Sequence, residues 1–320
     1  MCKLDKYLIS MHNARMSHAQ RAQNSVDACF VQAYAKINLT LEVLGRRADG
    51  YHDLATVMQT VDLCDTICLT ATKDNQVHLV CTKPELSNDD NLAAQAAHLV
   101  RQHLAIRQGV LIELHKRIPV AAGLGGGSSD AAAVLLALQQ WWQLQLSWND
   151  LLDLASSLGS DVPFFLTGGL ALCQGRGERV TALAPLWNES MRWLLLVKPA
   201  ISISTAAVFR NLPASDYTDG SHSQAVSTAL YAGQKPELKD LQNCFERIVL
   251  EAYPEVARAR TALLQAGASC ARLSGTGPTL FAPFSNLACA QKVQDQLQTL
   301  RYEVYLSRAI HPNQGRVSVF

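Results

Sequence analysis

The sequence predicts an α+β protein of two domains, on three observations. The chain has 320 residues, of which 48% are hydrophobic and 17% charged, so it can bury a substantial core and is not globally disordered. The expected strands and helices are interspersed without strict βαβ repetition, which favours α+β over a doubly wound sheet. The pattern changes character near residues 175–190, so we divide the chain into domains of residues 31–182 and 183–320.

Residues 1–30 are polar and lack the apolar core of a signal peptide. We expect either a disordered extension or a true start later in the chain, and we assign this segment no role. A transit peptide is a weaker alternative, because Asp5 and Asp27 are present and serines are few.

Residues 33–43 alternate between apolar and polar side chains, which predicts a half-buried strand. Lys36 and Asn38 lie on its polar face, so we expect both to point the same way, opposite the core. The Asp-Gly pair at 49–50 then signals a turn, and a second β-rich segment follows through about residue 69.

The remaining elements follow from periodicity and from helix start and stop signals. Helices are expected over residues 91–104 (capped near Asp89 or Asp90), from the glycine-rich loop to about 142, from a capping box at Ser147 to Gly159, and over 244–266 with a break at Pro254. Strands are expected at residues 77–81, 109–115, 162–173, 192–198 and 279–284, and a loop at residues 211–224.

Residues 119–133, PVAAGLGGGSSDAAA, are the most informative segment. Glycine backbone bends without Cβ clashes and lets its N–H groups approach a ligand closely. Ser128, Ser129 and Asp130 stand where helix caps stand, before a helix-forming run. A glycine loop that opens onto a helix N-terminus is a site for an anion, most often phosphate. We therefore expect a nucleotide phosphate held by backbone amides.

Two common phosphate loops do not match this segment. A P-loop needs Lys-Ser or Lys-Thr after its last glycine, where this chain has Ser128 and Ser129. The dinucleotide fingerprint fails because Ser128 takes its final glycine position, which disfavours a nucleotide-binding oxidoreductase. A flexible surface turn is the other alternative, and it is less favoured because two serines and a helix follow the glycines.

Asp161 and Lys36 are the candidates for acid–base chemistry. Asp161 lies between a helix end and an apolar segment, where a partly desolvated carboxylate can take a proton from a substrate hydroxyl. Lys36 would keep that carboxylate ionised and orient the hydroxyl. The alternatives are a turn aspartate and a solvated strand lysine, and spacing alone does not exclude them. Residues 273–278, LSGTGP, form a second glycine-rich turn that is weak by itself.

Together the three segments resemble the GHMP kinase superfamily (galacto-, homoserine, mevalonate and phosphomevalonate kinases). The order and separations agree over about residues 31–312. The resemblance implies an N-terminal domain of the ribosomal S5 domain 2-like fold and a ferredoxin-like C-terminal domain. The matching residues are Lys36 in the first motif, Pro119, Gly123, Leu124, Gly125, Ser128 and Ser129 in the second (with extra glycine between), and Gly275, Thr276 and Gly277 in the third.

Longer segments are similar to one branch of this superfamily, the kinases that use ATP to phosphorylate the erythritol 2-hydroxyl of CDP-methylerythritol. That reaction belongs to the methylerythritol phosphate route to isoprenoid precursors. The segments are AYAKINLTLEVLGRRADGYHDLATVMQTVDLCDTI, GLGGGSSDAAA, GSDVPFF, VKPAISISTAAVF and LSGTGPTLFA. The resemblance therefore implies ATP and CDP-methylerythritol as ligands, with Mg²⁺ as the metal of phosphoryl transfer.

The resemblance also implies roles for single residues. Lys36 and Asp161 match the catalytic pair, and no residue is placed to form a phosphoenzyme. The substrate-binding positions are matched by Asn38, Thr205, Tyr51 (stacking on cytosine), His52 (hydrogen-bonding the base edge) and Phe209 (facing the other side of the base). The ATP-binding positions are matched by Asn91 and Lys116 near the adenine, and by the backbone of Gly123, Leu124, Gly125, Gly126, Gly127, Ser128 and Ser129 at the phosphates.

Asp130 is left with two interpretations: it could cap the helix or help hold Mg²⁺ through water, so we assign no metal ligands. Other partners are limited by composition. Lys and Arg number 28 against 27 Asp and Glu, which argues against nucleic acid, and no apolar run is long enough to span a membrane. The nine cysteines include no C-x-x-C pair, so we expect reduced thiols in the cytoplasm.

Two alternatives to this function stay open. One is another GHMP kinase that phosphorylates a different small alcohol. The other is a metabolite sensor that keeps the fold and has lost catalysis, which the joint presence of Lys36 and Asp161 disfavours.

Overall fold

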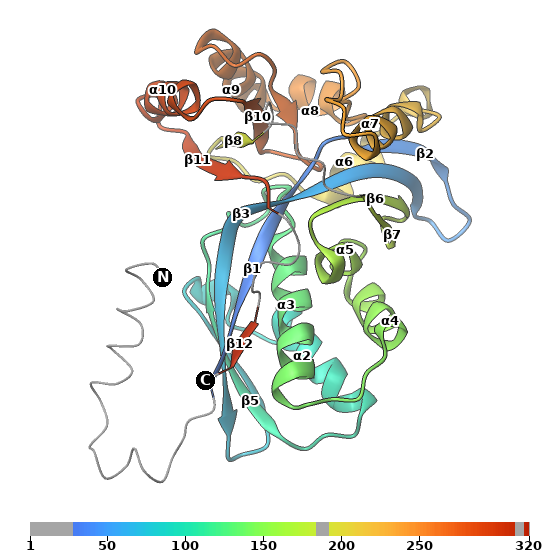
Figure 1. Ribbon diagram of the computed structural model, residues 1–320, viewed down its shortest axis with the longest axis vertical. Coiled ribbons are helices and arrows are strands. Elements are labelled where there is room, and N and C mark those ends of the chain that lie inside the picture. The colour runs from blue at the N-terminus through green and yellow to red at the C-terminus, as the bar shows by residue number, and fades with distance from the viewer. Residues whose placement is uncertain (1–27, 184–191, 311–316, 320) are drawn as a thin grey trace.

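The structure is a computed structural model that describes residues 28–183, 192–310 and 317–319. The architecture is α+β, as the sequence predicts, with two sheets that each carry helices (Figure 1). The expected extension falls largely on residues 1–27, which lie outside the described residues.

Strand β3 (His52–Thr72) organises the larger sheet, because it is long enough to pair with different partners along its length. It pairs antiparallel with β1 (Ala28–Asn38), β2 (Glu42–Arg46), β5 (Gly109–His115) and β6 (Leu170–Gly175). The sheet is completed by β4 (Val77–Cys81), β7 (Arg179–Ala182) and β12 (Val317–Val319), which pair with β5, β6 and β1 respectively.

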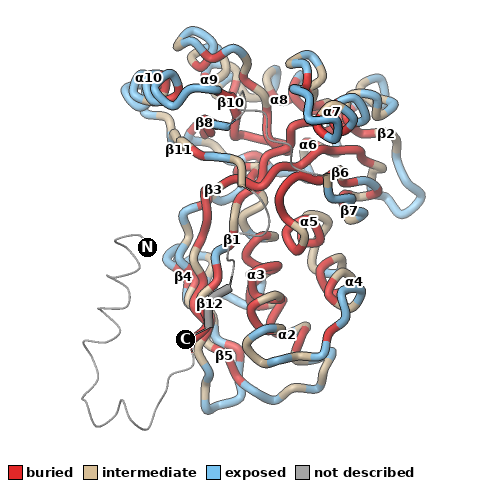
Figure 2. Tube along the Cα trace, viewed as in Figure 1, coloured by how far each residue is buried: buried red, intermediate tan, exposed pale blue. Residues whose placement is uncertain are grey.

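Four helices cover one face of this sheet (Figure 1). They are α2 (Leu92–His103), α3 (Gly126–Trp141), α4 (Trp148–Leu158) and α5 (Val162–Thr167). Helix α3 lies at the centre and is buried along much of its length (Figure 2). Its run of alanines lets α2 and the sheet approach closely, and together they form the first hydrophobic core.

The second sheet is antiparallel, in the order β11 (Glu303–Arg308), β8 (Trp193–Lys198), β10 (Leu280–Phe284) and β9 (Arg272–Leu273). Helices α9 (Pro254–Gln265) and α10 (Leu287–Gln298) pack against it. The remaining helices are η1 (Pro84–Leu86), α6 (Thr205–Asn211), η3 (Ala214–Asp216), α7 (Ser221–Tyr231) and α8 (Glu246–Ala252).

The two sheets are joined by a buried apolar cluster. Ile37 and Val57 from the larger sheet meet Leu194, Leu196 and Phe281 from the smaller one. The last strand, β12, also returns to the larger sheet and pairs with β1. The division at residue 182/183 falls just after β7 and stays a prediction.

Most predicted elements are present, but several predictions about their type, bounds or caps are wrong. Residues 162–167 form helix α5 instead of a strand, because a short, fully buried apolar run has no period of its own. The strand predicted over 33–43 breaks after Asn38, where Leu41 turns away to hydrogen-bond with Gln242 and Cys244. Residues 221–231 form α7 instead of the end of a loop. Helix α2 is capped by Asn91 rather than by Asp89 or Asp90.

Candidate active site

The three motif segments meet at one cavity of about 1080 Å³. The backbone N–H of Lys36 on β1 donates a hydrogen bond to the carbonyl of Leu124 in the glycine loop, at 3.0 Å. The hydroxyl of Ser274 donates to the carbonyl of Gly123, also at 3.0 Å. The loop is therefore attached to the first motif on one side and to the third motif on the other.

Backbone conformation explains why this loop needs glycine. Gly123 and Gly125 have φ values of +74° and +70°, a region that L side chains rarely adopt. A Cβ on Gly123 would lie 2.2 Å from the Ser274 carbonyl oxygen, and one on Gly125 would lie 2.7 Å from the Phe165 ring. The glycines thus permit close packing beneath the loop as well as ligand approach above it.

Helix α3 begins inside the glycine run. Its N-cap is Gly125, which offers no side chain to the first turn, and Gly126, Gly127 and Ser128 line the cavity. The expectation that Ser128, Ser129 and Asp130 precede the helix as caps is wrong, because they belong to its first turn. The free N–H groups of this turn, together with the helix dipole, make the cavity floor a site for an anion.

The proposed catalytic pair lies at the edge of this loop. Lys36 Nζ is 3.4 Å from Asp161 Oδ2 and donates to Asn38 Oδ1 at 2.6 Å. Asn38 in turn donates to the Thr56 hydroxyl at 2.8 Å, so the ammonium group is fixed from two sides. Lys36 and Asn38 point the same way, as predicted, but that strand face is buried rather than solvated: their exposures are 4% and 2%.

Asp161 is more accessible than its lysine partner. Its side chain is 33% exposed, and it stands at the N-terminal end of α5 beside Ser160. This differs from the expected place before a strand, yet it still points the carboxylate into the cavity. A carboxylate with one cationic neighbour and an open side can receive a proton from a hydroxyl brought to it.

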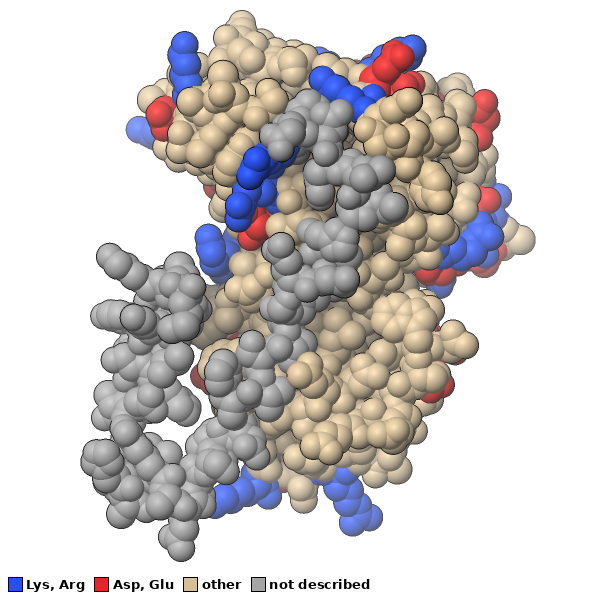
Figure 3. Space-filling model, in the orientation of Figure 1, with Lys and Arg blue, Asp and Glu red and all other residues tan. Residues whose placement is uncertain are grey.

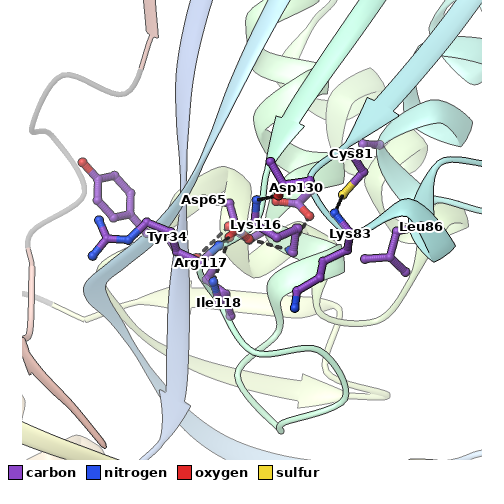
Figure 4. A network of polar contacts seen from close by, with 12 residues as sticks. Tyr34, Asp65, Cys81, Lys83, Leu86, Lys116, Arg117, Ile118 and Asp130 are labelled. Atoms are coloured by element: carbon purple, nitrogen blue, oxygen red, sulfur yellow. Dashed lines mark hydrogen bonds and ion pairs between the residues drawn. The ribbon is translucent and has the colours of Figure 1, made fainter. Parts of the chain in front are cut away.

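A buried polar network lies beneath the start of α3 (Figure 4). Lys116 Nζ is 2.5 Å from Asp65 Oδ2 and 2.7 Å from Asp130 Oδ2, and all three side chains are at most 4% exposed. Asp65 Oδ1 also accepts the backbone N–H groups of Arg117 and Ile118. The network therefore ties β3, the segment after β5, and α3 together directly under the loop.

Burial governs the ionisation of this network. Burial raises the pKa of Asp130 well above its usual value; Lys116 opposes that shift and the neighbouring Asp65 adds to it. Burial alone would lower the pKa of Lys116, but the two carboxylates outweigh it and raise that pKa. Asp130 Oδ1 has no hydrogen-bond partner among the described residues.

Aromatic side chains form the far end of the cavity. The His52 ring lies 5.4 Å from the Phe209 ring and 6.0 Å from the Tyr217 ring, and Phe209 packs edge-on against Phe245 at 4.6 Å. Burial, and then the positive charge of Arg46, lower the pKa of His52, which favours a neutral imidazole that can both donate and accept. Tyr51 is 53% exposed and lines the same cavity, so its ring is available for stacking.

The buried side-chain amide of Asn243 fixes the third motif on the side away from the cavity. Asn243 Nδ2 donates to the carbonyls of Leu273 and Gly275, at 2.9 and 2.8 Å. In front, the hydroxyls of Thr205 and Thr276 are 3.0 Å apart. The turn therefore presents Thr276 to the cavity beside Thr205, the first residue of α6, in a fixed relation to the glycine loop.

The structure brings most of the sequence-predicted residues to this cavity. Those that line it are Lys36, Asn38, Tyr51, His52, Asn91, Lys116, Pro119, Gly123, Gly125, Gly126, Gly127, Ser128, Asp161, Thr205, Phe209, Gly275 and Thr276. Three do not: Leu124 is buried in the core between the sheets, Gly277 packs against Leu273, and Ser129 donates its hydroxyl to the Tyr34 carbonyl.

Sequence reasoning missed three residues that matter here. Asp65 lies inside a strand and Asn243 follows an irregular segment, so no periodic signal marks either. Arg176 also lines the cavity, and its position between Gly175 and Gly177 in a tight turn was the one available signal.

The described residues lack two features, an acidic or thiol metal cluster and a membrane-spanning helix. No group of three or more His, Cys, Asp or Glu side chains there could hold a metal ion. None of the helices there is long and apolar enough to cross a bilayer. On the face shown in Figure 3, the Lys and Arg side chains lie in small groups, several of them beside acidic ones.

Comparison with known proteins places this arrangement in a family. Residues 91–169 match the GHMP kinases N terminal domain, and residues 227–303 match the GHMP kinases C terminal domain. The chain is 39% identical over 282 residues to the 4-diphosphocytidyl-2-C-methyl-D-erythritol kinase of Clostridium kluyveri, covering 88% of this chain and 99% of the relative. It is 40% identical to the enzyme of the same name from Alkaliphilus metalliredigens, covering 86% and 94%.

Solved structures agree with the sequence matches. A crystal structure of 4-(cytidine 5'-diphospho)-2C-methyl-D-erythritol kinase superposes with a TM-score of 0.74 at 32% identity, covering 88% of this chain and all of the other (100%). The homoserine kinase from Cytophaga hutchinsonii superposes with a TM-score of 0.72 at 21% identity, covering 93% and 99%. The second match bears on the fold alone.

Proposed function

Because the chain belongs to the 4-diphosphocytidyl-2-C-methyl-D-erythritol kinase family of the GHMP kinases, we propose that its cavity transfers the γ-phosphoryl group of ATP to the 2-hydroxyl of 4-diphosphocytidyl-2-C-methyl-D-erythritol. The enzyme is thus a small-molecule kinase, and its reaction belongs to the route from methylerythritol phosphate to isoprenoid precursors.

One observation carries the proposal: a single cavity holds the glycine loop, the Lys36–Asp161 pair and the aromatic group around His52 and Phe209. The loop suits the phosphates of one nucleotide, and the aromatic group suits the base of a second. Asp161 lies between them, where a substrate hydroxyl would face the γ-phosphate. A volume of about 1080 Å³ exceeds the usual range for one small ligand and is compatible with two.

The mechanism we propose is direct transfer. Asp161 accepts the proton of the substrate hydroxyl as that oxygen attacks the γ-phosphorus, the bond from the γ-phosphorus to the β,γ-bridging oxygen breaks, and ADP leaves. Lys36, fixed by Asn38, orients the Asp161 carboxylate. The N–H groups at the start of α3 stabilise charge on the phosphate oxygens. No residue is assigned as a phosphoenzyme nucleophile.

Mg²⁺ fits this site through oxygen donors. Mg²⁺ keeps several waters and binds through one or two carboxylates plus substrate phosphates, so it does not need a cluster of acidic side chains. Ser128 beside the loop would hold it together with the phosphates and waters, and Asp130 Oδ1, which has no hydrogen-bond partner in the described part of the chain, would accept a hydrogen bond from one of those waters. When bound, the ion neutralises the charge that develops on the transferred group.

The nucleotide side of the cavity is assigned to Asn91 and Lys116. Both line it next to the loop, but both side chains are also engaged locally, Asn91 as the α2 cap and Lys116 in its network. We propose that they shape the adenine end from these positions. We also propose a reducing, cytoplasmic location, because the cysteines in the described part of the chain are all free thiols.

The test is an ADP-release assay with ATP and a panel of acceptors: CDP-methylerythritol, mevalonate, homoserine and galactose. We expect turnover only with CDP-methylerythritol, and its loss in Asp161→Asn. Turnover of another acceptor would instead identify a different GHMP kinase. Binding without turnover of any acceptor would identify a silent sensor.

A further inference from the structure

Arg176 occupies a constrained place in the cavity wall. It is the first residue of the turn between β6 and β7, and it lies between Gly175 at φ +72° and Gly177 at φ +114°. Its side chain is half-buried and lines the cavity. Its backbone N–H donates to Glu178 Oε2 at 2.6 Å, which fixes the turn. In Figure 1, the β6–β7 hairpin lies beneath β2 and above α5.

This turn touches both ends of the proposed substrate site. The Arg176 guanidinium lies 5.0 Å from the centre of the Tyr51 ring, at the base end. At the reacting end, the Cβ position of the adjacent Gly177 lies 3.6 Å from the Ser160 carbonyl oxygen and 3.9 Å from Asp161 Oδ1. A ligand that stacks on Tyr51 and places its hydroxyl at Asp161 must therefore pass the Arg176 side chain between these two points.

Charge distinguishes Arg176 from the two lysines of the cavity. Lys36 is paired with Asp161, and Lys116 with Asp65 and Asp130. Among the described residues, no carboxylate oxygen lies within ion-pair distance of the Arg176 guanidinium. Asp49 pairs with Arg47, whose hydrogen bond lowers the pKa of Asp49 with a smaller contribution from Arg176. Glu178 accepts the backbone N–H of the turn. Arg176 thus brings to the cavity wall a positive charge that has no ion-pair partner in the described part of the chain.

We propose that Arg176 binds the diphosphate bridge of the substrate and thereby sets the distance between base and hydroxyl. This proposal rests on the proposed function and adds a specificity-determining residue to it. A guanidinium presents parallel N–H donors that match two phosphate oxygens, a geometry that a lysine does not reproduce. The stacking contact with Tyr51 holds the guanidinium toward the cavity before the ligand arrives.

Isothermal titration calorimetry with cytidine, CMP and CDP tests this assignment, using wild type, Arg176→Met, Arg176→Lys and Arg179→Met. Arg179 is an exposed arginine two residues beyond Gly177 that does not line the cavity, so it is the matched control. We expect Arg176→Met to weaken CDP binding about 10- to 100-fold, the usual loss for a hydrogen bond to a charged group. Cytidine binding should weaken no more than about fivefold, from the lost contact with Tyr51.

Steady-state kinetics supply the second readout. Arg176→Met should raise the KM for CDP-methylerythritol while the KM for ATP stays unchanged, and Arg176→Lys should fall between wild type and Met. Arg179→Met should match wild type in both experiments. Thermal unfolding of each variant identifies any that fail to fold, and Arg176→Lys keeps the test valid if the Met variant is one of them.

The outcomes separate this proposal from the proposed function. Equal losses of affinity for cytidine and CDP would mean that Arg176 acts only through Tyr51. Unchanged CDP affinity would mean that Arg176 does not contact the diphosphate. Either result overturns the assignment of Arg176 and leaves the proposed kinase reaction intact. A wild type that binds neither CDP nor CDP-methylerythritol overturns both.

Discussion

Replacing Lys116 by Met should destabilise the protein strongly, because it removes the cation that lies between two buried carboxylates. The Lys116 ammonium lies 2.5 and 2.7 Å from Asp65 and Asp130, whose side chains are 0% and 2% exposed. Methionine keeps all but one atom of the side chain's length and leaves the two buried acids facing each other without a cation. The substitution therefore isolates charge from packing.

The size of the effect follows from this burial. Removing one partner of a buried ion pair costs about 3–5 kcal/mol, which corresponds to a fall in Tm of roughly 6–20 °C at about 2–4 °C per kcal/mol. The double variant Lys116→Met/Asp130→Asn should recover part of the loss. It leaves one acid, Asp65, which still accepts the backbone N–H groups of Arg117 and Ile118. Coupling between such neighbours is about 0.5–3 kcal/mol.

Asp130 determines whether the folding stability rises or falls with pH. The pKa of Asp130 is higher in the folded state than in the unfolded state. The proton on Asp130 therefore contributes its full stabilisation at pH values below the unfolded-state pKa. This stabilisation is lost as the pH rises through the folded-state pKa. Lys116→Met, which removes a group that opposes this shift, should therefore cost more at pH 8 than at pH 5. As the pH rises from 5 to 8, the Asp130→Asn variant alone should become more stable relative to wild type.

Urea unfolding followed by tryptophan fluorescence is the assay. Trp141 and Trp142 lie at the end of α3, packed against the first core cluster, and report on this region. A loss below about 1 kcal/mol for Lys116→Met at pH 8, or a double variant no more stable than the single one, would refute the reasoning. The network would then be open to water or already protonated.

Three further predictions concern the reaction. Asp161→Asn should lower kcat by about 10²–10⁴-fold with little change in ATP affinity, and near-normal turnover in a folded variant would remove Asp161 as the base. Gly125→Ala, at φ +70° and 2.7 Å from Phe165, should weaken ATP binding more than CDP binding in calorimetry; equal weakening would place the ATP phosphates elsewhere. Tyr51→Ala should weaken CDP-methylerythritol binding about 5- to 150-fold, the equivalent of about 1–3 kcal/mol of stacking, and normal binding would exclude the stacking role.

Much of the fold was predictable because its signals are local. The strands at 77–81 and 109–115 were predicted at their observed bounds, and the Ser147 capping box does begin a helix that ends at Leu158. Residues 162–167 were mispredicted because their environment, not their pattern, decides their structure. A run buried on all sides, as α5 is, needs no polar face and so gives no period.

Some residues of the candidate site were likewise predictable from local sequence, and others were not. Glycines that must adopt positive φ and serines at a helix start are visible in sequence, because their local conformation demands those residue types. Lys36 illustrates what is not visible. Alternation correctly placed it with Asn38, but whether that face meets water or other parts of the chain depends on residues far along the sequence, namely Gly125 and Asp161 beside Lys36 and Gly275 beside Asn38. Long-range packing leaves no periodic trace at the residue that it buries.

The glycine loop is held in place by residues outside its own sequence motif. Lys116, Asp65 and Asp130 hold the start of α3 from below, while Asn243 holds the turn that contacts Gly123. Donors aimed at a transition state are effective because they are already in place, with no reorganisation during the reaction. A relative could therefore keep every glycine and lose catalysis by losing Asp65 or Asn243. The geometry of the glycine motif in this chain therefore depends on these supports as well as on the glycines themselves.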